Sequence, residues 1–226
     1  MSAESPQAPG EFLDLLDDED RAALEARAGR RRFKPGATLT HQGAPGSEVL
    51  VLLSGRAKVS IDTAEGREVV LTFCGPGHLI GEFAVIDSEA RSGTTEALEP
   101  VEALALSAPD FLGLLEERPR IAMALLHNLI RRFRDADRIR IEFASAQTLG
   151  RVASRLCELA ERHGEPDADG IAITLPISQE ELAGWTGASR EATAKALQQL
   201  RELDLIRTER RRIVVLDDEG LRRLAA

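Results

Sequence analysis

The chain contains only two cysteines among its 226 residues, and Cys74 and Cys157 lie in quite different segments. Such a pair suggests neither a disulfide framework nor a thiolate metal cluster. Long apolar runs are also missing, since none approaches the roughly 20 residues that span a bilayer. The first residues have neither the basic start nor the apolar core of a signal peptide. We therefore expect a soluble, cytoplasmic protein.

An excess of positive charge is absent as well, because the formal net charge is −9. Phosphate contacts need cations, so this total at first argues against a nucleic-acid partner. The total, however, averages over segments that need not touch the same partner. Between residues 190 and 212, seven basic residues outnumber four acidic ones. This stretch is locally positive.

We expect a folded chain rather than a disordered one, because 43% of the residues are hydrophobic. Residues 1–10, rich in Ser, Ala, Pro and Gly, indicate a flexible tail. From residue 32 to residue 107, short apolar runs such as VLVLL and AKVSI are separated by Gly or Pro. This punctuation is typical of many antiparallel strands, and it predicts a small β-barrel.

Residues 119–146 are interrupted by neither Gly nor a further Pro, and they carry a stripe at spacings of three and four. The stripe predicts a long helix with a heptad seam. Its members are Ala122, Leu125, Leu129, Arg132, Ala136, Ile139, Phe143 and Ala146. Packing against the helix's own domain would give a similar stripe. The polar Arg132 within it favours a dimerisation helix with a functional insertion.

The last third of the chain carries the most specific local signal. Ser178 and Glu181 form a capping box at the start of one helix, and Gly187 ends that helix. Ser189 then caps a second helix with long polar side chains near its start. This is the pattern of a helix-turn-helix, whose second helix enters the major groove. The following IRTERRRIVVL alternates like a two-stranded wing. Trp185, beside the turn, is expected to be a packing residue.

With its parts in this order, the chain resembles the Crp/Fnr family of bacterial transcription regulators. The segments that carry the resemblance are GATLTHQG, LSGRAKVS, GEFAV and ASREATAKALQQL. It implies an α+β fold with a cyclic-nucleotide-binding β-barrel of the jelly-roll, cupin-like type at 11–118. A dimerisation helix at 119–146 and a winged helix-turn-helix at 147–226 follow. It also implies a homodimer on palindromic double-stranded DNA, allosterically controlled by cAMP, with RNA polymerase as a partner.

The resemblance assigns a ligand to the barrel. Arg91 and Ser92 match the family's phosphate-binding positions, while Gly81 and Glu82 match its ribose positions. The chemistry agrees, because a phosphodiester suits a guanidinium and a hydroxyl, and a ribose hydroxyl suits a carboxylate. Arg132 matches the second arginine of a family pair that lies near the same pocket.

The base-reading end departs from the family pattern. Where cyclic-AMP-responsive members carry Thr-Ser or Thr-Asn, this chain has Ala136 and Asp137. Asp137 can accept a hydrogen bond from the adenine amine, although burying its charge costs free energy. The expected effector is cAMP. Another nucleotide, or a form that is active without ligand, is the alternative.

Other chemistries of the family and of similar barrels need residues that this chain lacks. Iron–sulfur members use an N-terminal cysteine cluster, and no cysteine precedes Cys74. The spacing of Cys74 and His78 differs from that of the haem-binding members, and Cys157 is expected to pack in a core. The four histidines are scattered without an H-x-H pair, so we expect no metal and no enzyme. A cyclic-nucleotide-gated regulatory subunit is the non-DNA alternative, but it would lack a recognition helix.

On the DNA side, the resemblance gives the second helix a base-reading role. Arg190 suits the O6 and N7 atoms of guanine, and Glu191 suits a cytosine amine. Lys195 replaces the arginine of the best-known members and lacks its bidentate fork. The expected half-site is of the TGTGA type, repeated as an inverted palindrome. Ser189 belongs to the same interface, and the wing arginines are expected to meet phosphates. These arginines are Arg207, Arg210, Arg211 and Arg212.

Overall fold

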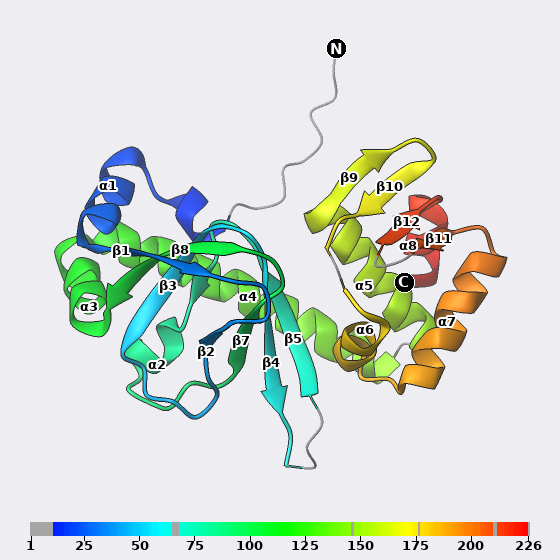
Figure 1. Ribbon diagram of the computed structural model, residues 1–226, viewed down its shortest axis with the longest axis horizontal. Helices are drawn as coiled ribbons and strands as arrows, with labels where there is room; N and C mark the ends of the chain where they lie inside the picture. Colours follow the sequence, from blue (N-terminus) through cyan, green and yellow to red (C-terminus); the bar gives the residue numbers. More distant parts are fainter. Residues whose placement is uncertain (1–10, 65–67, 146, 176, 210–211, 226) are drawn as a thin grey trace. The chain divides into compact units, whose positions relative to one another are not determined.

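The computed structural model describes residues 11–64, 68–145, 147–175, 177–209 and 212–225. The chain divides into two compact units, residues 1–134 and 135–226 (Figure 1). Among the described residues, no helix is both long and apolar enough to cross a membrane.

The first unit contains two antiparallel four-stranded sheets, with strand orders β1-β8-β3-β6 and β2-β7-β4-β5. The strands are β1 (Gly29–Phe33), β2 (Thr38–Thr40), β3 (Glu48–Ser54), β4 (Ala57–Asp62), β5 (Glu68–Cys74), β6 (Leu79–Ile80), β7 (Thr94–Ala97) and β8 (Val101–Ser107). Gly55, at φ 79°, makes the tight turn between β3 and β4. The predicted succession of short antiparallel strands is confirmed.

Strand β3 is buried on both faces, which explains its uninterrupted apolar run. Leu50 and Leu52 belong to a core that both sheets share. Val49 and Val51 belong to a second core with the helices of this unit. The helices are η1 (Phe12–Leu15), α1 (Asp18–Arg27), α2 (Glu82–Ile86), α3 (Ala108–Glu117) and, as far as residue 134, α4 (Pro119–Ser145). The first unit therefore has two sheet layers and one helical layer.

Helix α4 presents a different face to its own unit than the heptad analysis predicts. Leu125 is 5% exposed and belongs to the helical core, and Leu129 packs against it. The predicted seam is therefore wrong in register over these turns. The apolar side chains left exposed are Met123 (50%), Leu126 (47%), Ile130 (42%) and Phe133 (67%). These four residues, here called the exposed stripe, keep spacings of three and four. The side chains of Ile139 and Phe143, and all of Ala146, lie outside the described residues.

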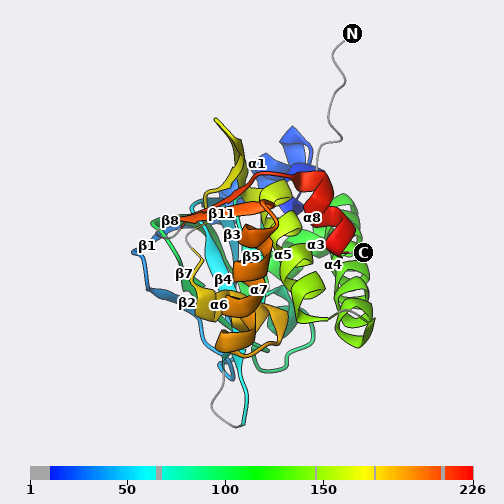
Figure 2. The ribbon, with the colours of Figure 1, turned by 90° about the vertical axis from the view of Figure 1, so that its right-hand side faces the viewer.

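The second unit packs four helices, α5 to α8, on one another (Figure 2), beside a four-stranded sheet of order β11-β12-β10-β9. Its elements are α5 (Thr148–His163), β9 (Gly164–Asp167), β10 (Gly170–Ile173), α6 (Gln179–Thr186), α7 (Arg190–Glu202), β11 (Ile206–Glu209), β12 (Arg212–Val215) and α8 (Asp218–Ala225). The predicted wing is present as β11 and β12. The β9–β10 hairpin that extends its sheet was missed, because a strand of sequence GEPD contradicts strand propensity.

The core of the second unit contains one buried cation. Arg155 is 2% exposed, forms a 2.6 Å ion pair with Glu158, and lies 5.3 Å from the centre of the Trp185 ring. Trp185 is buried, as predicted. Cys157 is buried too, and desolvation raises the pKa of its thiol to about 11. A thiol in this state is a packing group rather than a nucleophile.

Candidate functional site

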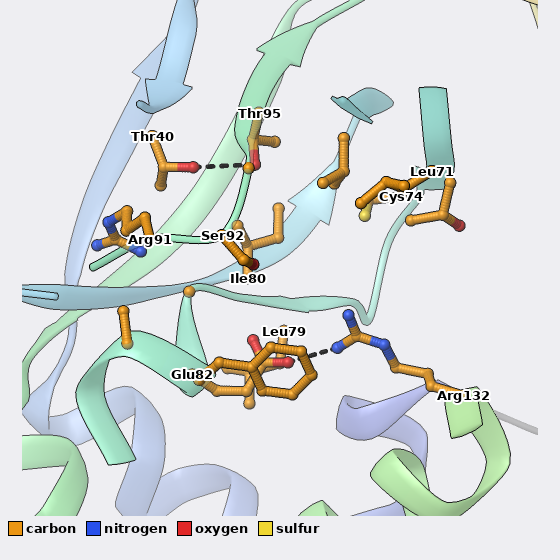
Figure 3. A pocket seen from close by; sticks show the side chains of 16 residues that line it. Thr40, Leu71, Cys74, Leu79, Ile80, Glu82, Arg91, Ser92, Thr95 and Arg132 are labelled. Atoms are coloured by element: carbon orange, nitrogen blue, oxygen red, sulfur yellow. Dashed lines mark hydrogen bonds and ion pairs between the residues drawn. The ribbon is translucent and has the colours of Figure 1, made fainter. Parts of the chain in front are cut away.

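A cavity in the first unit brings together five residues from three segments of the sequence (Figure 3). They are Gly81, Glu82, Arg91, Ser92 and Arg132, all assigned to a ligand from the sequence. Strands β2, β4, β5 and β6, the start of β7 and helices α2 and α4 supply its walls. The fold thus collects these residues around one space.

Arg91 is the charged centre of this cavity. Its side chain is buried, and its Nη2 donates a 2.7 Å hydrogen bond to the carbonyl oxygen of Glu48. Its Nη1 is buried and has no hydrogen-bond partner among the described residues. Desolvation lowers the pKa of Arg91, and the carboxylates of Glu48 and Glu82 partly offset this. Because a buried donor without an acceptor is costly, this atom is suited to an anion.

Gly81 makes room for the Arg91 guanidinium. It lies before α2 in the left-handed region, at φ 87°, where side chains are disfavoured. A Cβ atom at Gly81 would stand 2.0 Å from the Nη1 of Arg91. The glycine is therefore required twice, by the backbone and by the guanidinium.

Glu82 faces the cavity from the first turn of α2. It is 2% exposed, and its Oε1 forms an ion pair with Arg132 of α4. The Arg132 guanidinium also lies 5.1 Å from the centre of the Phe83 ring. This pairing compensates the burial of the Glu82 charge. The pair also explains why Arg132 occurs among the apolar residues of the predicted heptad seam.

Two threonines on the cavity wall were missed by the sequence analysis. Thr40 and Thr95 are buried, and their hydroxyl oxygens lie 2.9 Å apart (Figure 3). Two hydroxyls that share one hydrogen bond leave one hydrogen undonated. Single threonines on separate strands carry no motif, so only the pairing of β2 with β7 reveals them.

The base-reading residues are not among the described lining of this cavity. Ala136 is exposed, and the Asp137 carboxylate pairs with Arg140 at 3.2 Å. Both belong to the second unit, so their role toward a nucleotide base stays a prediction. Cys74 lines the cavity, whereas His78 Nδ1 accepts a 3.2 Å hydrogen bond from the Gly75 N–H. Within the described ranges, no cluster of side chains is suited to a metal ion.

The second unit contains the predicted helix-turn-helix. Ser178 accepts a hydrogen bond from the Glu181 N–H at 3.1 Å, and the Glu181 carboxylate reciprocates at 2.7 Å. Gly187 ends α6 in the left-handed conformation at φ 59°. Ser189 caps α7 by accepting from the Ala192 N–H at 3.1 Å. The capping predictions are confirmed.

Helix α7 presents polar side chains to solvent near its start. Thr193, Ala196, Leu197 and Leu200 bury its other face. Arg190, Glu191 and Lys195 are exposed and have no ion pair or hydrogen bond within the described residues. They are therefore available to a partner, in contrast to Arg207 and Arg212 of the wing.

The wing arginines divide into two groups. Arg207 and Arg212 form ion pairs with Asp167, Asp169 and Glu209. Arg210 and Arg211 lie outside the described residues.

Both halves of the chain match known protein families. Residues 30–118 match the cyclic nucleotide-binding domain, and residues 150–224 match the Crp-like helix-turn-helix domain. The CRP-like cAMP-activated global transcriptional regulator of Mycobacterium tuberculosis is 31% identical over 204 residues, which are 90% of this chain and 91% of the relative. The Cyclic AMP receptor protein of Thermus thermophilus is 32% identical over 197 residues, 87% of each chain.

Solved structures show the same fold. The c-di-GMP responsive regulator CLP of Xanthomonas campestris has a TM-score of 0.80 at 24% identity and covers 89% of this chain and 100% of its own. TTHB099, a CRP-family regulator of Thermus thermophilus, has a TM-score of 0.74 at 27% identity, covering 86% of this chain and 96% of its own.

The chain therefore belongs to the Crp/Fnr family of transcription regulators. It is a DNA-binding regulator with a cyclic nucleotide-binding domain, and its α+β fold is the one expected. The Mycobacterium tuberculosis relative and TTHB099 are both described as transcriptional regulators.

The contact between Gly81 and Arg91 can be tested by substitution. We predict that Gly81→Ala lowers the free energy of unfolding of the first unit by about 1–3 kcal/mol more than Gly36→Ala does. Gly36 has a similar φ of 77°, but a Cβ there would meet nothing within 4 Å. Urea denaturation followed by circular dichroism measures both. Equal losses would mean that the Arg91 guanidinium moves aside freely.

Proposed function

We propose that the protein is a homodimeric transcription regulator whose binding to palindromic operators is controlled by a cyclic nucleotide, with cAMP as the effector. The observation that carries the effector assignment is the buried, unpartnered Nη1 of Arg91. A phosphodiester would supply the missing acceptor, and Ser92 at the rim would add a hydroxyl donor. Glu82 keeps a second carboxylate oxygen for a ribose hydroxyl.

The choice of cAMP over another nucleotide rests on relatives. The Mycobacterium tuberculosis and Thermus thermophilus proteins are named for cAMP. CLP, by contrast, is described as responsive to c-di-GMP. Because Ala136 and Asp137 replace the usual adenine-reading pair, the purine is the least constrained part of the ligand. Calorimetric titration with cAMP, cGMP and c-di-GMP distinguishes the alternatives, and a form active without ligand would bind none of the three.

The exposed stripe supports the dimer. Four large apolar side chains along one helical face form a patch of the kind that marks an interface. Their spacings of three and four suit a coiled coil with a second copy. Helix α4 also carries Arg132, directly before Phe133 of the stripe, so a ligand that alters the Arg132–Glu82 pair would act on the dimer helix. Such a ligand shifts the equilibrium only by its differential affinity for the two states.

The DNA-reading role of α7 rests on its three unpaired polar side chains. Arg190 would bind a guanine, Glu191 a cytosine amine, and Lys195 a second guanine with less discrimination. In a two-fold dimer the two helices would meet half-sites one DNA turn apart. Half-sites of the TGTGA type and RNA polymerase as a partner belong to the same proposal.

The phosphate assignment predicts the behaviour of Arg91→Ala. This variant should lose about 2–5 kcal/mol of binding free energy for cAMP in calorimetry, because the phosphate loses its guanidinium. Glu82→Ala should lose less. Arg32→Ala is the matched control, because the Arg32 side chain is 84% exposed on β1, and its affinity should not change. Unchanged affinity in the Arg91 variant would exclude this cavity as the phosphate site.

The dimer assignment predicts different outcomes for two adjacent leucines. Leu126→Glu should give monomers in sedimentation while changing the free energy of unfolding of the first unit by under about 0.5 kcal/mol. Leu125→Glu should unfold that unit, because Leu125 is buried in its core and an unpaired charge there is costly. A wild-type protein that sediments as a monomer at micromolar concentration would contradict the dimer.

The base-reading assignment predicts a sequence-dependent loss for Arg190→Ala. It should lose roughly 1–3 kcal/mol on a TGTGA palindrome and little on random-sequence DNA. Arg223→Ala, which removes the same charge from the exposed surface of α8, is the control. Fluorescence anisotropy with both duplexes measures the difference. Equal losses of the Arg190 variant on both duplexes would mean that α7 does not read bases.

A further inference from the structure

The sheet of the second unit gathers five charged side chains from three strands and a turn. They are Asp167 of β9, Asp169 of the β9–β10 turn, Arg207 and Glu209 of β11 and Arg212 of β12, here called the wing network. Strand β12 lies between β11 and β10. The side chains of Arg207 and Arg212 form ion pairs with Asp167 and Asp169, and these pairs connect the wing to the β9–β10 hairpin.

Arg207 is engaged at all three of its nitrogen atoms. Its Nη1 lies 2.6 Å from Asp169, its Nε 3.2 Å from Glu209 and its Nη2 3.4 Å from Asp167. The hydrogen bonds to Asp169 and Glu209 raise the pKa of Arg207. The guanidinium therefore already has the anionic partners that a DNA phosphate would otherwise provide.

Arg212 is held by two of the same carboxylates. Its Nη2 lies 2.8 Å from Asp167 and its Nη1 3.3 Å from Glu209. Asp167 thus forms ion pairs with both Arg207 and Arg212. With two cations and three carboxylates, the network has a net charge of −1, although the linear sequence of this region is basic.

These contacts change what the wing can contribute to DNA binding. A lysine or arginine gains affinity for DNA because its phosphate contact releases a condensed cation. Arg207 and Arg212 would first have to give up an internal carboxylate, which then faces the negatively charged duplex. The recognition helix has no such competitor, since Arg190 and Lys195 are unpaired within the described residues.

We propose that Asp167, Asp169 and Glu209 are specificity-determining residues for DNA recognition. By occupying Arg207 and Arg212 they lower affinity for the phosphate backbone of any duplex. Binding then depends more heavily on the base contacts of α7. Since a regulator must discriminate against a large excess of non-specific sites, lower backbone affinity raises the useful ratio of specific to non-specific binding. The inference rests on the DNA-binding role, and it departs from the expectation that Arg207 and Arg212 simply contact phosphates.

The chain offers a closely matched pair of variants for the test. Asp167→Asn removes the carboxylate that joins both arginines. Glu165→Gln removes the same charge from the same hairpin, where Glu165 is exposed and has no partner within the described residues. Both full-length proteins are compared with the wild type by fluorescence anisotropy, on a random-sequence duplex and on a TGTGA palindrome, between roughly 50 and 200 mM salt.

We expect Asp167→Asn to bind the random-sequence duplex several-fold more tightly. The slope of log affinity against log salt should steepen by up to about one, because one new phosphate contact is worth about 0.9. Arg212 is the arginine most affected, since it then keeps only Glu209, whereas Arg207 keeps Asp169 and Glu209. Affinity for the palindrome should rise less, so the specificity ratio falls. Glu165→Gln should stay within about twofold of the wild type, with an unchanged slope, because a screened charge acts weakly beyond the Debye length. Asp169→Asn, which frees one contact of Arg207, should give a smaller change than Asp167→Asn.

The wing arginines provide the decisive control. In an Arg207→Ala, Arg212→Ala background, Asp167→Asn should no longer tighten binding. The inference is overturned if Asp167→Asn leaves the slope unchanged, if Glu165→Gln has the same effect, or if the gain persists without the two arginines. A wild-type protein that binds neither duplex, with or without cAMP, would instead contradict the DNA-binding role, and the inference with it.

Discussion

The buried guanidinium of Arg91 is the interaction on which the rest of the first unit depends. A cation in this position needs acceptors, and among the described residues the carbonyl of Glu48 on β3 satisfies Nη2 while Nη1 has none. That atom is left for a ligand. The guanidinium can lie this close to the backbone of residue 81 only because that residue is a glycine. From Gly81 the chain turns directly into α2. That turn is what delivers Glu82 to the same cavity.

Three faces of helix α4 have different roles in the first unit. One face completes the helical core through Leu125, a second carries Arg132 to Glu82, and a third leaves the exposed stripe free. A helix that satisfied only its own core would not need large apolar side chains on the outside. Their exposure supports the proposed dimer surface.

Local signals in the sequence were sufficient for the helix caps, because the Ser178 box, the Gly187 turn and the Ser189 cap depend on residues within three or four positions. The cavity residues followed from family resemblance. The α4 register could not be derived, since the run LLHNLIRRF offers apolar residues to two adjacent faces. The Thr40–Thr95 pair depends on long-range strand pairing, which no local pattern encodes. The β9–β10 hairpin is local, but the sequence GEPD of its first strand contradicts strand propensity.

Both candidate binding surfaces contain internal ion pairs that resemble the contacts a ligand would make. Glu82 is held by Arg132 where a ribose hydroxyl would bind, and Arg207 and Arg212 are held by carboxylates where a phosphate would bind. Breaking such a pair lowers the net gain from each external contact. Arg91 and Arg190 differ, because the first keeps a free donor and the second has no described partner at all. Recognition should therefore depend mainly on Arg91 in the first unit and on Arg190 in the second, while the paired groups adjust the affinity.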